Sequence, residues 1–206
     1  MRIVGGKFKG RRLAAVPGKG TRPTADRVRE ALFNRLLVRY ELEGASLLDL
    51  FAGSGALGLE GLSRGAAELL SVERDRGAVA VVEANFERCG LRADGTQAGG
   101  TRPDGLQAEV LGVAVAAALG RLAREGRVFD GVFVDPPYAG PLALETLETL
   151  GGLELLGPGG WVSVETDRQA RLPDSTGSLL LVRRDDYGDT ALWLYEAGAR
   201  RQGNRA

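Results

Sequence analysis

The sequence contains no histidine and only one cysteine, Cys89. Without histidine it can build neither Ser–His–Asp or Cys–His nucleophilic machinery nor a histidine-ligated metal site. A single thiol can form neither an internal disulfide nor a thiolate zinc cluster. Any chemistry must therefore use carboxylates, amides, hydroxyls, backbone groups and a bound cofactor, and we expect no resident metal.

Long apolar runs are also missing. No stretch reaches the roughly 18 residues that a transmembrane helix needs, and no apolar segment of a secretory signal follows the basic N-terminus. We therefore expect a cytoplasmic protein without a membrane partner. The 206 residues, 44% hydrophobic and 26% charged, fit one globular domain.

The net charge of zero hides an uneven distribution of charges. Residues 1–39 carry eleven lysines and arginines against two carboxylates, a net charge of +9, and the remainder carries −9. A basic arm on an acidic body is typical of a surface that binds a polyanion. The alternative interpretation is a solvated, mobile terminus.

The N-terminal region is predicted to form a hairpin and a helix. Two extended runs, residues 2–7 and 11–16, flank Lys9-Gly10, and Thr24 can cap the helix that follows. We assign residues 1–40 to this basic extension. Apolar residues recur at helical spacing, at Val28, Leu32, Leu36 and Leu37. Basic residues lie on the opposite face, at Arg27, Arg35 and Arg39.

From Ser46 onward, apolar strands alternate with helical patterns, which predicts a doubly wound α/β fold with a mostly parallel sheet. Seven strands are expected, and the closely spaced last two must pair antiparallel. Residues 41–197 form this domain, and 198–206 a basic, disordered tail. The predicted strands are residues 46–50, 69–72, 106–111, 131–134, 159–164, 179–184 and 190–196. The predicted helices are residues 56–64, 76–88, 113–124 and 142–150.

The first strand runs into a glycine-rich turn that opens the next helix. Glycines at such a turn let the backbone approach a ligand closely. The spacing of its glycines does not match the usual dinucleotide fingerprint. Taken alone, the turn could equally serve to pack a helix against a strand. Its sequence is Asp49-Leu50-Phe51-Ala52-Gly53-Ser54-Gly55.

Glu73 ends the second strand. An acid at this place can accept both hydroxyls of a ribose, although alone it could equally be a surface or capping acid. Because the carboxyl ends of parallel strands share one rim of the sheet, we expect Asp49, Glu73 and Asp135 to lie together there. The turn and Glu73 predict a ligand with a ribose, which leaves both nicotinamide cofactors and S-adenosylmethionine open.

The fourth strand ends in Asp135-Pro136-Pro137-Tyr138. The prolines stiffen this turn, so the Asp135 carboxylate and the Pro136 carbonyl become fixed acceptors for an NH2 group on a planar base. Tyr138 would stack on the base, a contact worth about 1–3 kcal/mol. We predict all four residues to be catalytic. The alternative is a proline-terminated strand with a partly buried tyrosine.

The missing groups also shape the predicted mechanism. With no histidine base and no metal set, the electrophile must arrive already activated, and a sulfonium methyl is such a group. We therefore predict S-adenosylmethionine as the cofactor, with the protein aligning the base amine and excluding water. Asp135 and the Pro136 carbonyl would stabilise positive charge developing on nitrogen. Whether Asp135 also removes a proton stays open.

With these motifs assembled, the chain resembles the RsmD family of bacterial 16S ribosomal RNA guanine-N2 methyltransferases, from Met1 to Glu196. The most specific stretches are Arg2-Ile3-Val4-Gly5-Gly6-Lys7-Phe8-Lys9-Gly10-Arg11, Arg22-Pro23-Thr24 and Asp26-Arg27-Val28-Arg29-Glu30-Ala31-Leu32-Phe33-Asn34. Further matches are the glycine-rich turn with Ala56-Leu57-Gly58-Leu59-Glu60, the turn at Asp135, and Tyr187-Gly188-Asp189-Thr190.

The resemblance implies a Rossmann-like class I methyltransferase fold and S-adenosylmethionine as the methyl donor. It implies one guanine of 16S ribosomal RNA as the target, in free RNA or in the small ribosomal subunit. The cofactor-binding residues would be Asp49, Phe51, Ala52, Gly53, Ser54, Gly55, Glu73, Arg74, Arg22 and Thr24. The RNA-binding residues would be Arg2, Lys7, Lys9, Arg11, Arg12, Lys19 and Arg27.

Two departures from the family pattern stand out. Members usually carry an acid after the third strand that contacts the adenine amine, whereas this chain has Leu111-Gly112-Val113-Ala114. A backbone carbonyl would have to substitute, or cofactor affinity would be lower. The glycine-rich loop at residues 92–105 is also longer than usual.

Other functions remain as alternatives. Adenine-N6 methylation of DNA or RNA fits the chemistry of the turn equally well, and only the N-terminal resemblance favours guanine. Sites for protein glutamine methylation typically carry Asn where this chain has Asp135. A non-catalytic RNA-binding or ribosome-assembly protein would not need the acceptor pair. A nicotinamide oxidoreductase is disfavoured because its fingerprint and a proton donor set are missing.

Overall fold

The computed structural model describes residues 1–17, 23–92, 105–137 and 141–198. The predicted order of strands and helices from residue 46 onward is confirmed apart from one additional two-residue strand, and the helix of residues 76–88 has the predicted bounds. The helices are α1 (Pro23–Arg39), α2 (Ala56–Ser63), α3 (Arg76–Arg88), α4 (Val115–Arg124) and α5 (Leu142–Gly152). The strands are β1 (Ser46–Leu50), β2 (Glu68–Val72), β3 (Gln107–Leu111), β4 (Phe129–Val134), β5 (Leu156–Asp167), β6 (Ser175–Thr176), β7 (Leu179–Tyr187) and β8 (Thr190–Ala197).

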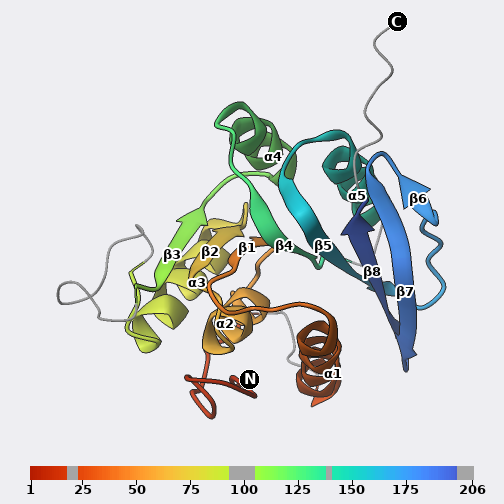
Figure 1. The fold of residues 1–206 in the computed structure, drawn as a ribbon. Helices are drawn as coiled ribbons and strands as arrows, with labels where there is room; N and C mark the ends of the chain where they lie inside the picture. The colour runs from red at the N-terminus through yellow and green to blue at the C-terminus, as the bar shows by residue number, and fades with distance from the viewer. Residues whose placement is uncertain (18–22, 93–104, 138–140, 199–206) are drawn as a thin grey trace, which may run out of the picture.

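The strands form one sheet in the order β3-β2-β1-β4-β5-β8-β7-β6, with helices on both faces (Figure 1). Strands β1 to β5 pair in parallel, and β8 pairs antiparallel with β5 and β7. The described part of the sheet has eight strands rather than the predicted seven, because the two-residue β6 extends the edge beside β7. Two residues are too few to show an alternating pattern in the sequence. The carboxyl ends of β1, β2 and β4 share one rim.

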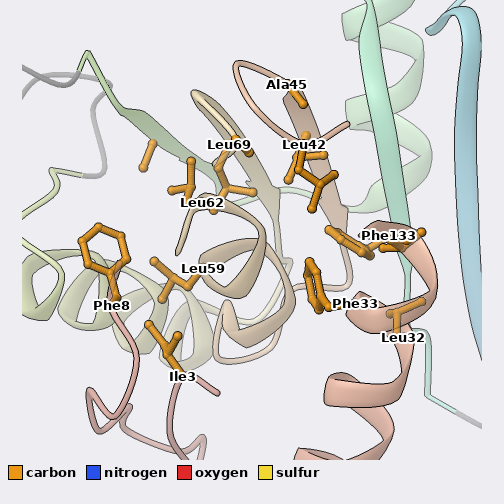
Figure 2. Close-up of a cluster of buried hydrophobic side chains, with 14 of the residues drawn as sticks. Ile3, Phe8, Leu32, Phe33, Leu42, Ala45, Leu59, Leu62, Leu69 and Phe133 are labelled. Carbon is orange, nitrogen blue, oxygen red and sulfur yellow. The ribbon is translucent and has the colours of Figure 1, made fainter. Parts of the chain in front are cut away.

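Two apolar cores fill the two faces of the sheet. On one face, α1, α2 and α3 pack through a cluster that includes Phe33 and Phe133 (Figure 2). The ring centroids of Phe33 and Phe133 lie 5.6 Å apart with the rings tilted, and the ring of Trp161 in β5 meets Phe133 in a T-shaped contact with 5.1 Å between centroids. On the other face, α4 and α5 pack through Leu119 and Leu147. Helix α1 is therefore part of the domain core.

The two runs of the N-terminal arm (residues 1–17) meet in a hairpin, as predicted, but they pair over a shorter stretch than two extended strands. They pair antiparallel at the bridge between Arg2 and Arg12, where Ile3 N–H donates to the Arg11 carbonyl at 3.0 Å and Leu13 N–H to the Met1 carbonyl at 3.1 Å. The amides of Val4 and Gly5 donate instead to the Glu60 carboxylate of α2, each at 2.8 Å. The paired stretch is short because the Val4 and Gly5 amides bond to a buried side chain of the body rather than to the opposite run.

The arm is also not a mobile terminus. Ile3, Phe8 and Leu13 are buried in the core of α2 and α3. Figure 2 shows Ile3 and Phe8 in this cluster. The Phe8 amide donates to Ser63 Oγ at 2.8 Å, which closes the contact with the end of α2. The basic side chains of the arm are therefore carried on an anchored segment.

Helix α1 differs from the prediction at two points. It begins at Pro23, so Thr24 lies inside the first turn rather than at the cap. Proline suits this position because its missing N–H has no intrahelical partner. Val28, Leu32 and Leu36 are buried as predicted, but Leu37 is 45% exposed and Phe33 takes its place in the core. No helix of the described residues is long and apolar enough to span a membrane.

Candidate active site

A cavity of about 970 Å³ opens at the carboxyl ends of β1, β2 and β4. It brings together the three motifs that the sequence predicted to share a rim. The motif residues that line it are Asp49, Phe51, Ala52, Gly53, Ser54, Glu73, Arg74, Asp135, Pro136 and Pro137. Other walls come from α1, α5, β5 and the start of α4, with Val28, Arg29, Leu32, Glu145, Thr146, Glu165, Ala114 and Val115.

The glycine-rich turn has an unusual backbone. Phe51 has a φ of 60°, a left-handed conformation that a bulky side chain rarely adopts. Gly55, with a φ of 73°, forms the N-cap of α2. Such conformations persist only where the surroundings enforce them, and they are common at ligand sites. The turn is therefore a preformed rim of the cavity rather than a plain connection.

Asp49 is buried at the end of β1, and its carboxylate accepts the Gly58 amide of α2 at 3.1 Å. Burial raises the pKa of Asp49 to about 7, and the charge of Glu73 adds to the rise. The hydrogen bond from Gly58 works in the opposite direction. A positively charged ligand in the cavity would stabilise the ionised form.

Glu73 is held by two backbone amides. Its carboxylate oxygens accept Gly53 N–H at 3.0 Å and Asp75 N–H at 2.9 Å. Glu73 is 7% exposed and lines the cavity, so it both fixes the glycine turn and presents an acceptor to a ligand. Each carboxylate oxygen has a further lone pair for a hydroxyl donor.

The predicted catalytic turn follows β4. Asp135 is half-buried, Pro136 is buried and Pro137 is exposed, and all three line the cavity. The Asp135 amide points toward the Leu50 carbonyl at 3.5 Å, so this residue continues beside the end of β1. Tyr138 lies outside the described residues.

The remaining predicted site residues lie in different places. Gly55 is buried at the start of α2 and does not line the cavity, whereas Arg74 is exposed at its edge. Lys19 and Arg22 lie outside the described residues, as does the side chain of Thr24. The predicted RNA-binding residues that are described are exposed and do not line the cavity: Arg2, Lys7, Lys9, Arg11, Arg12 and Arg27.

The arginines of the arm differ in their surroundings. Arg11 donates to the Arg88 carbonyl and lies over the Phe8 ring, with 5.4 Å between its guanidinium carbon and the ring centroid. Within the described residues, neither Lys9 nor Arg12 has an ion pair. Lys9 and Arg12 therefore present their charge to solvent, and Arg11 also holds the arm in place.

Sequence reasoning missed three buried polar residues that join the arm to the site. Glu60 accepts the arm amides and also pairs with Arg64 at 2.8 Å. Asn85 of α3 donates to the Ser54 carbonyl of the glycine turn at 2.8 Å and accepts the Ala14 amide at 2.7 Å. Arg29, a cavity wall, donates to the Arg2 carbonyl. For Glu60 and Asn85, the only signal in the sequence was an acid or an amide on the apolar face of an amphipathic helix.

The cavity fits S-adenosylmethionine. Its volume lies at the upper end of the roughly 300–1,000 Å³ range of small-molecule sites. Glu73 offers an acceptor for ribose hydroxyls, and Asp49 offers a carboxylate near which a cation is favoured. Ala114 and Val115, which follow β3, give the cavity an apolar wall. In the described part of the chain, no group of three or more acids or thiols is arranged to hold a metal ion.

Comparisons with known proteins agree with this interpretation. A family model described as Conserved hypothetical protein 95 matches residues 1–196. The chain is 36% identical to Ribosomal RNA small subunit methyltransferase D of Escherichia coli K12, covering 97% of this chain and 91% of that protein. The solved structure of a hypothetical protein from Thermus thermophilus superposes with a TM-score of 0.75 at 33% identity, covering 94% and 98% of the two chains.

The Rossmann-like sheet, the cavity at its rim and the methyltransferase relatives define an S-adenosylmethionine-dependent methyltransferase of class I. Within that class, the chain belongs to the RsmD family, whose model covers almost its whole length.

Proposed function

We propose that this chain transfers a methyl group from S-adenosylmethionine to the exocyclic N2 of one guanine in 16S ribosomal RNA. The observation that carries the proposal is the shared cavity, which the Asp135–Pro137 segment lines together with Glu73 and the glycine turn. A relative of 36% identity bears the name of a small-subunit ribosomal RNA methyltransferase. We place the reaction in the cytoplasm.

In the proposed mechanism, the chain binds the donor, orients the base and excludes water. Bound S-adenosylmethionine supplies an activated methyl group on a sulfonium. Glu73 and the glycine turn hold the donor, and Asp49 stabilises its positive charge. The Asp135 carboxylate and the Pro136 carbonyl accept hydrogens of the amine, so that its lone pair is free to react. Tyr138 would stack on the base.

RNA binding is assigned to the anchored basic arm. Exposed lysines and arginines bind phosphates without regard to sequence, so they give affinity and orientation rather than specificity. Because the arm hydrogen-bonds to α2 and α3, RNA bound there would be held at a fixed position relative to the cavity. Arg22 and Thr24 belong to the proposal as residues near the donor or the base.

The test is a product analysis. The chain is incubated with labelled S-adenosylmethionine and unmodified small-subunit RNA, offered both free and as assembled subunits, and the nucleosides are then identified. We expect N2-methylguanosine. N6-methyladenosine would support the adenine alternative instead. Absence of any labelled nucleoside from both substrates would contradict an enzymatic role and favour a non-catalytic RNA-binding protein.

A further inference from the structure

A second carboxylate stands beside the proposed amine acceptors. Glu165 of β5 lines the same cavity as Asp135 and is half-buried. Val134 and Val164 are partners in the parallel pairing of β4 and β5, so Asp135 and Glu165 follow at equivalent places along neighbouring strands. Adjacent strands lie about 4.8 Å apart. One base edge could therefore meet both side chains.

The strand also fixes which way Glu165 faces. Its neighbour Thr166 is buried, and Thr166 Oγ1 accepts the Trp193 indole N–H at 2.9 Å. Trp193 belongs to the core on the α4 and α5 face. Because successive side chains of a strand alternate, Glu165 faces the opposite side, which α1 covers. There Val28 and Leu32 of α1 add an apolar wall to the cavity.

We propose that Glu165 is a specificity-determining residue that accepts the N1–H of the target guanine while Asp135 and the Pro136 carbonyl bind the N2 amine. This inference rests on the proposed function. Guanine presents N1–H and the N2 amine side by side, both as donors. Adenine presents an N1 lone pair beside its N6 amine, which a carboxylate repels. A carboxylate here therefore selects guanine, a choice that the acceptors at residues 135 and 136 cannot make.

The test compares two bases that share the reacting amine. Synthetic small-subunit RNA fragments carry either guanine or 2-aminopurine at the target position. In 2-aminopurine, N1 is a hydrogen-bond acceptor, whereas in guanine N1–H is a donor. Wild-type enzyme should strongly prefer the guanine RNA. In Glu165→Gln, kcat/KM for guanine should fall roughly 10- to 100-fold. The preference over 2-aminopurine should shrink by a similar factor, because an amide can donate to that base.

Glu148→Gln is the matched control, since Glu148 is an exposed glutamate of α5 that does not line the cavity. It should leave both rates unchanged, and S-adenosylmethionine should bind wild type and both variants with equal affinity. An unchanged base preference in Glu165→Gln would overturn this inference while leaving guanine methylation intact. If Glu145→Gln alone relaxed the preference, the recognising carboxylate would belong to α5. A wild-type enzyme that methylates no guanine would instead refute the proposed function itself.

Discussion

Asp135 is the residue on which the proposed chemistry depends most directly. It is half-buried at the end of β4 and lines the cavity beside Pro136. We expect Asp135→Ala to reduce methyl transfer by about 10²-fold or more, because it removes a preorganised acceptor from the amine. Affinity for S-adenosylmethionine, measured by calorimetry, should stay within about twofold. Full turnover by the variant would refute the assignment.

Asp49 predicts a dependence of stability on pH. Its pKa is about 7 in the fold, against an ordinary 3.8. The stability that this group contributes is therefore fully present below pH 3.8 and lost as the pH rises through about 7. Asp49→Asn keeps an acceptor for the Gly58 amide but cannot ionise. Its free energy of unfolding relative to wild type should rise between pH 5 and pH 8, by at most about 3 kcal/mol.

Denaturant unfolding at the two pH values, without added donor, measures this difference. Glu43→Gln is a suitable control because its carboxylate is exposed and remote from the cavity. Parallel pH profiles for wild type and Asp49→Asn would contradict the assignment of a raised pKa.

Some residues of the site could be predicted from the sequence, and others could not. Asp49 is the last residue but one of β1, and Glu73 and Asp135 directly follow β2 and β4, so strand periodicity alone predicts that they meet. Glu165 was missed although it directly follows the predicted strand of residues 159–164, because no glycine-rich or proline-rich turn accompanies it there and β5 in fact continues to Asp167. Glu60 and Asn85 were hidden because their partners are amides of the distant arm, a pairing that no local pattern records.

At the scale of elements, the close approach of the arm to α2 depends on Gly6. The Lys7 amide donates to the Ser63 carbonyl at 2.6 Å, and a Cβ on Gly6 would lie 1.7 Å from that same oxygen. Gly6 also has a φ of 71°. We expect Gly6→Ala to destabilise the fold by about 3 kcal/mol or more in thermal or denaturant unfolding.

Gly10→Ala provides the control for this prediction. Gly10 has a similar φ of 83°, but a Cβ there would meet nothing within 4 Å. It should therefore cost only the conformational strain, about 1–2 kcal/mol. Equal losses in the two variants would show that the contact with α2 is unimportant.

The anchored arm also changes how RNA binding should be tested. Deleting it would remove Ile3, Phe8 and Leu13 from the core, so lost binding could reflect lost folding. Lys9→Ser with Arg12→Ser removes charge without disturbing buried groups. The double variant should weaken RNA binding and lower the magnitude of its salt slope by about 1–2, since each phosphate contact contributes roughly 0.7–0.9. Arg124→Ser, on the exposed side of α4, should leave the slope unchanged.

At the scale of the whole molecule, alternating strands and helices were enough to predict the doubly wound sheet. What periodicity could not give was the attachment of the N-terminal region. Charge separation suggested a distinct basic arm, whereas Phe33 of α1 and Phe8 of the arm lie in the same core as α2 and α3. The arm has few apolar residues and many arginines, so its sequence does not indicate that those apolar residues are buried in the core.

This assembly also explains how one cavity can serve two ligands. The glycine turn, Glu73 and the start of α4 form the side expected to hold the donor, and α1, β5 and the end of β4 form the side expected to hold the base. Asn85 links the Ser54 carbonyl of the donor side to Ala14 of the arm. Donor, base and RNA backbone would therefore be oriented by a single connected framework.

A structure of the chain crystallised with S-adenosylmethionine tests this account most directly. We predict ribose hydroxyls on Glu73, the donor against residues 51–55, and the sulfonium methyl facing Asp135 and Pro136. A donor bound elsewhere, or one in the cavity whose methyl points away from the end of β4, would contradict it.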